Sequence, residues 1–424
     1  MTEVIAIEGG HKLNGTVRID GAKNATVALI PALVLAEGPV EIYGVPDISD
    51  VKALAELLEV LNCSVILKDD YIRVDPTNMK NVPLEHEAVL KLRASYYFMG
   101  ALLGKYKKVK IKMPGGCYLG PRPIDLHLKG FKALGAEIFY DEDNETYTLE
   151  AENLHGASIY LDFASVGATI NILLAAVKAN GRTTIENAAK EPEIIDVANL
   201  LVKMGAHIRG VGTDTITIDG VEHLSGTFHE IIPDRIEAGT FLIIAAAMGE
   251  KVVIDNVIPQ HLDALISKLK EMGVRMDAAD DSIIVYGGNE LKHVNVKTQT
   301  YPGFATDLQQ PLTALLTQAE GVSNIKETIY VERFAHCEQL NKMGAHIVKS
   351  QGKGSCYING KTPLHGTRVQ ATDLRCGAAL IIAGLMADGI TEISNVYHID
   401  RGYDNIDQKL IGLGAKITRY EVLG

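Results

Sequence analysis

The sequence predicts a two-domain α/β protein built from six copies of one helix–strand–helix–strand repeat. Its 424 residues are 47% hydrophobic and 22% charged, which is typical of a globular protein with a large core. A phrase of the form L-x-x-L-G-A-x-I recurs at intervals of 73, 70, 68, 71 and 70 residues. Each copy is preceded by a segment of small apolar residues, which predicts a helix buried on nearly all sides.

The six phrases mark helices that end in a left-handed residue and lead directly into a strand. Glycine enters that conformation without strain and asparagine is its usual substitute. The alternating segments that follow predict hairpins. The marker residues are Asn62, Gly135, Gly205, Gly273, Gly344 and Gly414.

Six repeats can form one solenoid or two groups of three. A solenoid needs polar caps, which neither terminus resembles, so we expect two domains. Repeats 1–3 occupy residues 22–229, and repeats 4–6 occupy 230–424 together with the N-terminal segment 1–21. A substrate site is expected in the cleft between the domains.

Charge and cysteine content narrow the class of protein. The net charge of −12 argues against an extended nucleic-acid surface but allows a local pocket for a small anion. Five cysteines without a CxxC pair suggest a reducing compartment. The first residues do not resemble a signal peptide, and the longest apolar runs are about half of a membrane span. We therefore expect a cytoplasmic protein with no membrane or nucleic-acid partner, and the oligomeric state stays open.

The segment Pro114–His127 (PGGCYLGPRPIDLH) is the most unusual in the chain. Its glycines and prolines predict an exposed loop, where functional residues concentrate. Cys117 lies near Arg122, and a positive neighbour increases thiol reactivity. The alternative is that Cys117 is a small apolar filler, as we expect for the other four cysteines.

Cationic residues precede several of the apolar helices. A helix start with a lysine or arginine suits a ligand with phosphate and carboxylate groups. The alternative for some of them is an ordinary ion pair with Asp234, Asp373 or Asp400. The candidates are Lys23 with Asn24, Arg93, Arg235, Arg333, Arg375 and Arg401.

Asp307, in YPGFATD, stands where other repeats carry a cation, so it is a candidate general base, with a helix cap as the competing interpretation. The 13 histidines form no metal motif, and the sequence lacks GxGxxG after a strand, GxxxxGK[ST] and GxSxG. We therefore expect no metal site, and nicotinamide, P-loop and serine-hydrolase chemistry lack support.

Together, the motifs GAKN, LRAS, PGGCYLGPRPIDLH, SVGAT, PDRIEAGT, YPGFATD and HIDRGYD resemble the enolpyruvyl transferases, and among these the branch that acts on UDP-N-acetylglucosamine. The family fold is an inside-out α/β barrel of two domains with three repeats each. The resemblance implies transfer of the enolpyruvyl group of phosphoenolpyruvate to the 3′-hydroxyl of UDP-N-acetylglucosamine, with release of phosphate, as the first committed step of peptidoglycan synthesis. It also implies that the reaction requires no metal or organic cofactor.

The resemblance also implies roles for individual residues. Cys117 would be the general acid, the carrier of a pyruvate adduct and the target of fosfomycin, and Asp307 would be the base. The residues that would bind phosphoenolpyruvate are Lys23, Asn24, Arg122, Arg333, Arg375 and Arg401, of which Lys23, Arg122 and Arg401 would also be catalytic. Those that would bind the nucleotide sugar are Asn24, Arg93, Arg122, Pro123, Ile124, Asp125, Leu126, Ser165, Val166, Gly167, Asp307 and Ile329.

Two positions depart from the family pattern. Phe163 stands where some members have lysine, and Glu332 replaces a common asparagine beside Arg333. The segment GVPDISD resembles the second of two versions of this transferase that some bacteria encode. The alternatives are the shikimate-pathway enolpyruvyl transferase and a non-catalytic regulatory relative, both disfavoured by the complete set of motifs.

Overall fold

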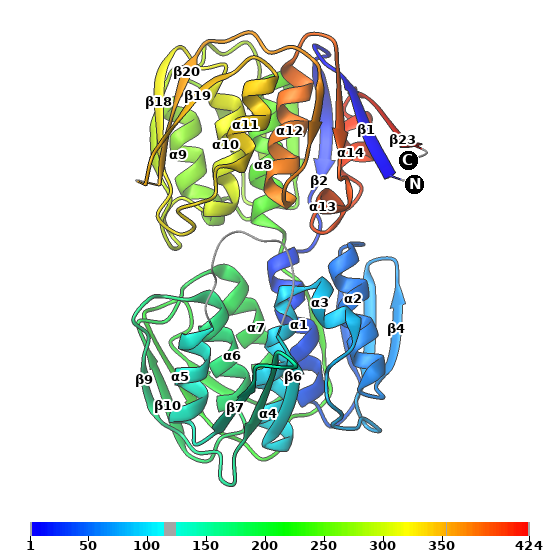
Figure 1. The fold of residues 1–424 in the computed structure, drawn as a ribbon, viewed down its shortest axis with the longest axis vertical. Helices are drawn as coiled ribbons and strands as arrows, with labels where there is room; N and C mark the ends of the chain where they lie inside the picture. Colours follow the sequence, from blue (N-terminus) through cyan, green and yellow to red (C-terminus); the bar gives the residue numbers. More distant parts are fainter. Residues whose placement is uncertain (1, 114–123, 353, 423–424) are drawn as a thin grey trace. The chain divides into compact units, whose positions relative to one another are not determined.

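The computed structural model describes residues 2–113, 124–352 and 354–422, and the chain divides into two compact units (Figure 1). The N-terminal unit runs from Gly21 to Ile232, and the C-terminal unit joins the segment up to Asp20 with the chain from Pro233 onward. Each unit has its own hydrophobic core. The second boundary falls after Ile232, because the strand Phe228–Glu230 still pairs within the N-terminal unit.

The N-terminal unit contains three buried helices, α1 (Lys23–Ala32), α4 (Tyr97–Tyr106) and α6 (Val166–Ala176), and the more exposed α2 (Ser49–Val60), α3 (Glu87–Lys91), α5 (Asp125–Ala133) and α7 (Pro192–Lys203). Its 3-10 turns are η1 (Leu33–Leu35) and η2 (Arg93–Tyr96). Its strands are β3 (Val40–Tyr43), β4 (Ser64–Lys68), β5 (Tyr71–Asp75), β6 (Lys108–Lys112), β7 (Glu137–Asp141), β8 (Thr146–Glu150), β9 (Ser158–Tyr160), β10 (Arg182–Glu186), β11 (His207–Arg209), β12 (Thr215–Asp219) and β13 (Phe228–Glu230).

The C-terminal unit follows the same plan. Its buried helices are α8 (Arg235–Met248), α10 (Gln309–Leu316) and α12 (Leu374–Met386), and its other helices are α9 (Asp263–Glu271), α11 (Ala335–Lys342), α13 (Tyr397–Asp400) and α14 (Ile406–Gly412), with 3-10 turns η3 (Pro259–Leu262) and η4 (Thr306–Leu308). Its strands are β1 (Thr2–Glu8), β2 (Leu13–Arg18), β14 (Gly249–Asp255), β15 (Arg275–Ala278), β16 (Ser282–Tyr286), β17 (Asn295–Lys297), β18 (Gly321–Lys326), β19 (His346–Ser350), β20 (Ser355–Gly360), β21 (Arg368–Gln370), β22 (Ile390–Ser394) and β23 (Lys416–Val422).

The sheets of the described chain share one topology. A central strand has a short parallel neighbour on one side and an antiparallel hairpin on the other, as in β9-β10-β12-β11 and β17-β18-β20-β19. In the sheet β6-β8-β7 the parallel neighbour is reduced to a bridge between Leu84 and Ile111. The repeat predicted from the 70-residue period is therefore confirmed as a structural repeat.

In each unit, strands from one end of the unit's chain pair with a distant repeat and so join the first and last of its three repeats. β13, from the end of the third repeat, pairs in parallel with β3 of the first repeat. At the other end of the chain, β1 lies between β22 and β23 and so supplies the missing hairpin strand of the sixth repeat, while β2 pairs with β14 of the fourth. The N-terminal segment thus contributes the strands β1 and β2 to the sheets of the C-terminal unit.

The six marker residues have the predicted backbone. Asn62 has φ = 60°, and the five marker glycines have φ between 98° and 113°. After α5, Gly135 and Ala136 donate their N–H groups to the carbonyls of Lys132 and Phe131, which closes the helix before β7 begins.

The helices formed by small apolar residues are buried, as predicted. In the C-terminal unit α8, α10 and α12 contact one another, and in the N-terminal unit α4 packs against both α1 and α6. Figure 1 shows these helices with strands along the outer side of each unit. This is the inside-out arrangement, in which sheets cover helices. Every helix among the described residues is too short or too polar to span a bilayer.

The chain is anchored just before it enters the N-terminal unit. Lys409 of α14 forms salt bridges with Asp20 and with Glu237 of α8, and the Asp20 amide donates to Glu237 Oε2 at 3.0 Å. The Asp20 carbonyl accepts from the Asp234 amide at 2.8 Å. These bonds fix the backbone three residues ahead of Lys23, the first residue of α1.

Candidate active site

Asp307 lies in η4, immediately before the buried helix α10. Its carboxylate accepts from Arg333 Nη1 at 2.8 Å and from Arg375 Nη2 at 3.4 Å. The Asp307 side chain is 24% exposed, whereas the two arginine side chains are only 3% and 2% exposed. One carboxylate with an accessible face is thus held by two buried guanidinium groups.

The helix-cap interpretation of Asp307 is wrong. The N-cap residue of α10 is Leu308, and no side chain caps that helix by a hydrogen bond. Asp307 is the middle residue of η4, and its two carboxylate oxygens are directed to Arg333 of the same repeat and to Arg375 of the sixth repeat.

The two arginines keep their charge despite burial. Burial lowers the pKa of Arg333, but the negative charges of Asp307 and Asp373 outweigh that effect and the pKa is raised. For Arg375, burial is likewise outweighed, by Tyr403 and Asp307, and its guanidinium lies 5.1 Å from the centre of the Tyr403 ring. The deprotonated form of Asp307 is the form that both salt bridges require.

Asp373 organises the start of α12 beside this pair. Its Oδ1 accepts from the backbone amides of Arg375 and Cys376, both at 3.0 Å, so it is the N-cap of α12. Burial and the positive charge of Arg401 lower the pKa of His398, and Asp373 opposes them. Arg401 directly follows α13, and α13 packs against α12.

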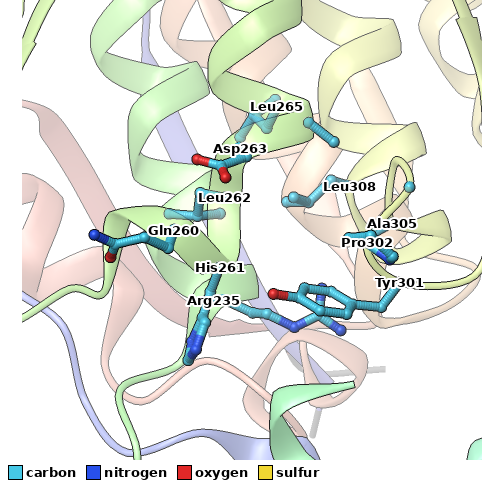
Figure 2. A pocket seen from close by; sticks show the side chains of 12 residues that line it. Arg235, Gln260, His261, Leu262, Asp263, Leu265, Tyr301, Pro302, Ala305 and Leu308 are labelled. Carbon is cyan, nitrogen blue, oxygen red and sulfur yellow. The ribbon is translucent and has the colours of Figure 1, made fainter. Parts of the chain in front are cut away.

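A small hollow borders the turn that leads to Asp307. It opens to solvent and is lined by η3 and by the Tyr301–Pro302–Gly303 turn. Figure 2 shows Arg235, the first residue of α8, extended beside the Tyr301 ring, and its guanidinium lies 5.4 Å from the ring centre. Arg235 thus packs against the segment that carries Asp307.

In the N-terminal unit, the predicted residues also lie at helix starts. Lys23 begins α1 and forms a salt bridge of 3.2 Å with Asp50, whose side chain is only 3% exposed. Arg93 begins η2 and lies 5.9 Å from the Tyr96 ring. Ser165 caps α6 by accepting from the Ala168 amide at 3.2 Å. The helix-start placement predicted for the cations is confirmed for Lys23, Arg93 and Arg235.

The remaining predicted residues divide into described and undescribed ones. Ile124 is buried just before α5, which begins with Asp125 and Leu126, while Val166 and Gly167 begin α6. Asn24 is in the first turn of α1, and Ile329 follows β18. The two departures, Phe163 and Glu332, are exposed. Cys117, Arg122 and Pro123 lie outside the described residues.

A buried polar cluster that the motif search missed connects three of these helix starts. Asn171 of α6 accepts from the Gly100 amide at 2.9 Å and donates to the Tyr96 carbonyl at 3.0 Å and to His127 Nδ1 at 2.9 Å. His127, in α5, is 5% exposed, and its ring meets the Tyr96 ring edge-on at 4.9 Å. A single asparagine within ATINILLAA was the available signal, because a buried amide requires partners.

His127 is held in its neutral form. Its Nδ1 faces an amide donor, and burial followed by the charge of Arg93 lowers its pKa to about 3. Between about pH 6.5 and pH 3 the unfolded chain binds a proton there that the folded chain does not. We expect stability to fall as pH falls through that window, by up to about 1.4 kcal/mol per pH unit from this residue.

The measurement is urea unfolding of the wild type and of His127→Gln at several pH values in that window. The variant should lose the part of the pH slope due to His127 even if its absolute stability is lower. The matched control is His346→Gln, because His346 is exposed to solvent and its substitution leaves the buried cluster around Asn171 intact. Equal slopes for the wild type and His127→Gln would contradict the assignment.

Among the described residues, no group of three or more histidine, cysteine or acidic side chains is arranged to hold a metal ion. The described cysteines Cys63, Cys337, Cys356 and Cys376 are all buried, in agreement with their interpretation as apolar filler.

Three comparisons place this architecture in a known class. Residues 7–410 match the family model of EPSP synthase (3-phosphoshikimate 1-carboxyvinyltransferase). The chain is 59% identical over 419 residues to UDP-N-acetylglucosamine 1-carboxyvinyltransferase 2 of Listeria monocytogenes, with 99% of this chain and 98% of that protein covered. It is 58% identical to the protein of the same name from Bacillus subtilis, with 98% and 96% covered.

Solved structures agree. The enolpyruvyl transferase NikO from Streptomyces tendae superposes with a TM-score of 0.90 at 26% identity, covering 99% of both chains. EPSP synthase from Acinetobacter baumannii gives a TM-score of 0.74 at 20% identity, covering 99% of this chain and all of that one, which supports the fold alone. The two-domain fold with helices inside sheets is that of the enolpyruvyl transferases. The chain belongs to the EPSP synthase family of enolpyruvyl transferases.

Proposed function

We propose that this protein transfers the enolpyruvyl group of phosphoenolpyruvate to the 3′-hydroxyl of UDP-N-acetylglucosamine and releases phosphate. The observation that carries the proposal is the identity of 58–59% over nearly the whole length to proteins named for that reaction. The product of such a reaction serves peptidoglycan synthesis, and the proposed location is the cytoplasm.

The proposed reaction is an addition followed by an elimination. In the addition, the sugar 3′-oxygen bonds to C2 of phosphoenolpyruvate while C3 receives a proton. In the elimination, C3 loses a proton and the C2–O bond to phosphate breaks, which leaves the enol ether. We assign Asp307 as the base for the 3′-hydroxyl and Cys117 as the acid at C3.

The arrangement around Asp307 supports its assignment as the base. Its partly exposed carboxylate can accept a proton from a hydroxyl, while Arg333 and Arg375 fix its orientation from the buried side. Phosphoenolpyruvate carries a carboxylate and a phosphate, and either group can compete for guanidinium donors when it binds. We assign Lys23, Arg122 and Arg401 to its anionic groups, with Asn24, Arg333 and Arg375 in support.

We assign the nucleotide sugar mainly to helix starts of the N-terminal unit. Backbone amides at the start of a helix suit the diphosphate, and Asn171 and His127 hold α5, α6 and the segment that ends η2 together. The residues proposed to contact it are Asn24, Arg93, Arg122, Pro123, Ile124, Asp125, Leu126, Ser165, Val166, Gly167, Asp307 and Ile329.

The deciding experiment is a phosphate-release assay with phosphoenolpyruvate and one of two acceptors. Phosphate release with UDP-N-acetylglucosamine but not with shikimate 3-phosphate is expected, and the reverse result would replace this proposal with the shikimate-pathway reaction. Release with neither acceptor would favour a non-catalytic relative. Activity should persist with a chelator present, because cationic side chains are proposed to neutralise the phosphate.

A further inference from the structure

Glu327 is a buried carboxylate that follows β18 and has hydrogen-bond donors on both oxygens. Only 1% of the surface of Glu327 is exposed to solvent. Oε1 accepts from Thr298 Oγ1 at 2.7 Å and from the backbone amides of Ile329 at 2.8 Å and Tyr330 at 3.0 Å. Oε2 accepts from Thr306 Oγ1 at 3.0 Å and from Gln309 Nε2 at 3.4 Å. A carboxylate this deeply buried is stable only because these donors replace water.

The two oxygens face different parts of the molecule. Oε1 joins the end of β17 to the backbone after β18. Oε2 reaches the start of η4 and the first residue of α10, and Thr306 is the neighbour of Asp307 in η4. Gln309 also donates to the Arg333 carbonyl at 2.9 Å.

The Thr306 hydroxyl group can donate its proton to only one of its two hydrogen-bond partners. Arg333 Nη1 lies 3.1 Å from Thr306 Oγ1 and can only donate, so this oxygen accepts from the guanidinium. Its single proton is then given to Glu327 Oε2. The same Arg333 Nη1 donates to Asp307 Oδ1 at 2.8 Å. Arg333, Thr306 and Glu327 therefore form an ordered relay in which each group has one fixed role.

We propose that Glu327 is a positioning residue that acts through Thr306 to hold Arg333 and the carboxylate of Asp307 in the orientation needed for proton transfer. This inference rests on the proposed function, because it assigns the relay to the base of that reaction. A proton acceptor must be held closely to its reactive geometry, and small displacements caused by a distant group can lower turnover about a hundredfold.

The test compares two threonines on opposite oxygens of the same carboxylate. Thr306→Val removes the hydroxyl that links Glu327 to Arg333, whereas Thr298→Val removes a donor that leads away from Asp307. Thr298 is matched because its hydroxyl also bonds to Glu327 and it is also part of the loop between β17 and α10. Thr306→Ser retains the hydroxyl and is the conservative variant.

Steady-state kinetics and thermal unfolding are measured for all variants. For Thr306→Val we expect kcat to fall about tenfold or more, while KM for UDP-N-acetylglucosamine changes less than about threefold. Thr306→Ser and Thr298→Val should keep kcat within about twofold, although Thr298→Val should lower the melting temperature. Glu327→Gln, which places an amide opposite Thr306 or the backbone donors, should resemble Thr306→Val.

The double variant Glu327→Gln/Thr306→Val should be no slower than the slower single variant, because both changes break one relay. Equal kcat for Thr306→Val and wild type, or equal loss of kcat in Thr306→Val and Thr298→Val, would overturn the inference while the proposed function stands. A wild-type protein without turnover would overturn both.

Discussion

Asp307→Asn is expected to lower kcat about a hundredfold or more, which is the usual contribution of a general base. The amide keeps the shape of the side chain but cannot take the proton of a substrate hydroxyl. Binding of UDP-N-acetylglucosamine, measured by calorimetry, should remain within about tenfold, since most assigned contacts lie elsewhere. Turnover close to wild type would remove Asp307 as the base.

The substitution also breaks two salt bridges, so its effect on stability must be separated from its effect on chemistry. Arg333 and Arg375 would be left buried beside a neutral amide, at a cost of roughly 1–3 kcal/mol. The matched control is Asp407→Asn, because Asp407 is a buried carboxylate of the same unit that pairs with Arg419 at 3.3 Å. That control should lose stability and keep kcat, so an equal loss of kcat in both variants would indicate a general structural effect.

The fold could be predicted because the same sequence pattern recurs in each of the six repeats. Asn62 and the five marker glycines each require a left-handed residue after a helix, and their spacing alone gives six repeats. The exchange of β1 and β13 between distant repeats was weaker in the sequence, because a three-residue strand such as Phe228–Glu230 has no periodicity to read.

The pairing within the site could not be predicted, because it depends on contacts between repeats. The local alternative was that Arg375 pairs with Asp373, two positions away. Instead, Asp373 accepts from the backbone amide of Arg375. The guanidinium of Arg375 reaches Asp307, 68 residues away in sequence. Asp400 binds Arg419, 19 residues further along the chain, through both oxygens. Sequence proximity suggested an ion pair between Asp373 and Arg375, but Asp373 instead caps α12.

The buried polar residues that support the site also could not be predicted from the sequence. Glu327 follows an ordinary strand, and His127 lies at the end of the segment Pro114–His127, in which the sequence pattern singled out the loop residues. Their importance comes from what surrounds them, namely five donors for Glu327 and an asparagine amide for His127. Pattern analysis finds residues that recur, whereas these occur once.

Fosfomycin is expected to alkylate Cys117 and no other cysteine of this protein. The thiolate attacks an epoxide carbon, the C–O bond opens, and the resulting alkoxide takes up a proton. The phosphonate would occupy the anion site proposed for Lys23, Arg122 and Arg401, and UDP-N-acetylglucosamine should accelerate the reaction. Although Cys117 lies outside the described residues, the other four cysteines provide the contrast.

Burial makes those four poor nucleophiles. Cys63 is 7% exposed, and Cys337, Cys356 and Cys376 are at most 1% exposed. Burial raises the pKa of Cys63 and of Cys376 to about 11. The pKa of Cys337 is raised by a hydrogen bond with Cys356 and by burial. Since the thiolate is the reactive form, these groups should react far more slowly than an accessible thiol beside arginine.

Peptide mass mapping after treatment, with and without the nucleotide sugar, measures the site of modification. Cys117→Ser should abolish the adduct and most product formation, whereas Cys63→Ser should leave labelling and turnover unchanged. Cys117→Asp should escape alkylation yet keep some activity, because a protonated carboxyl group can still donate a proton to C3. An adduct on any of the four buried cysteines, or no adduct in the presence of UDP-N-acetylglucosamine, would withdraw the role assigned to Cys117.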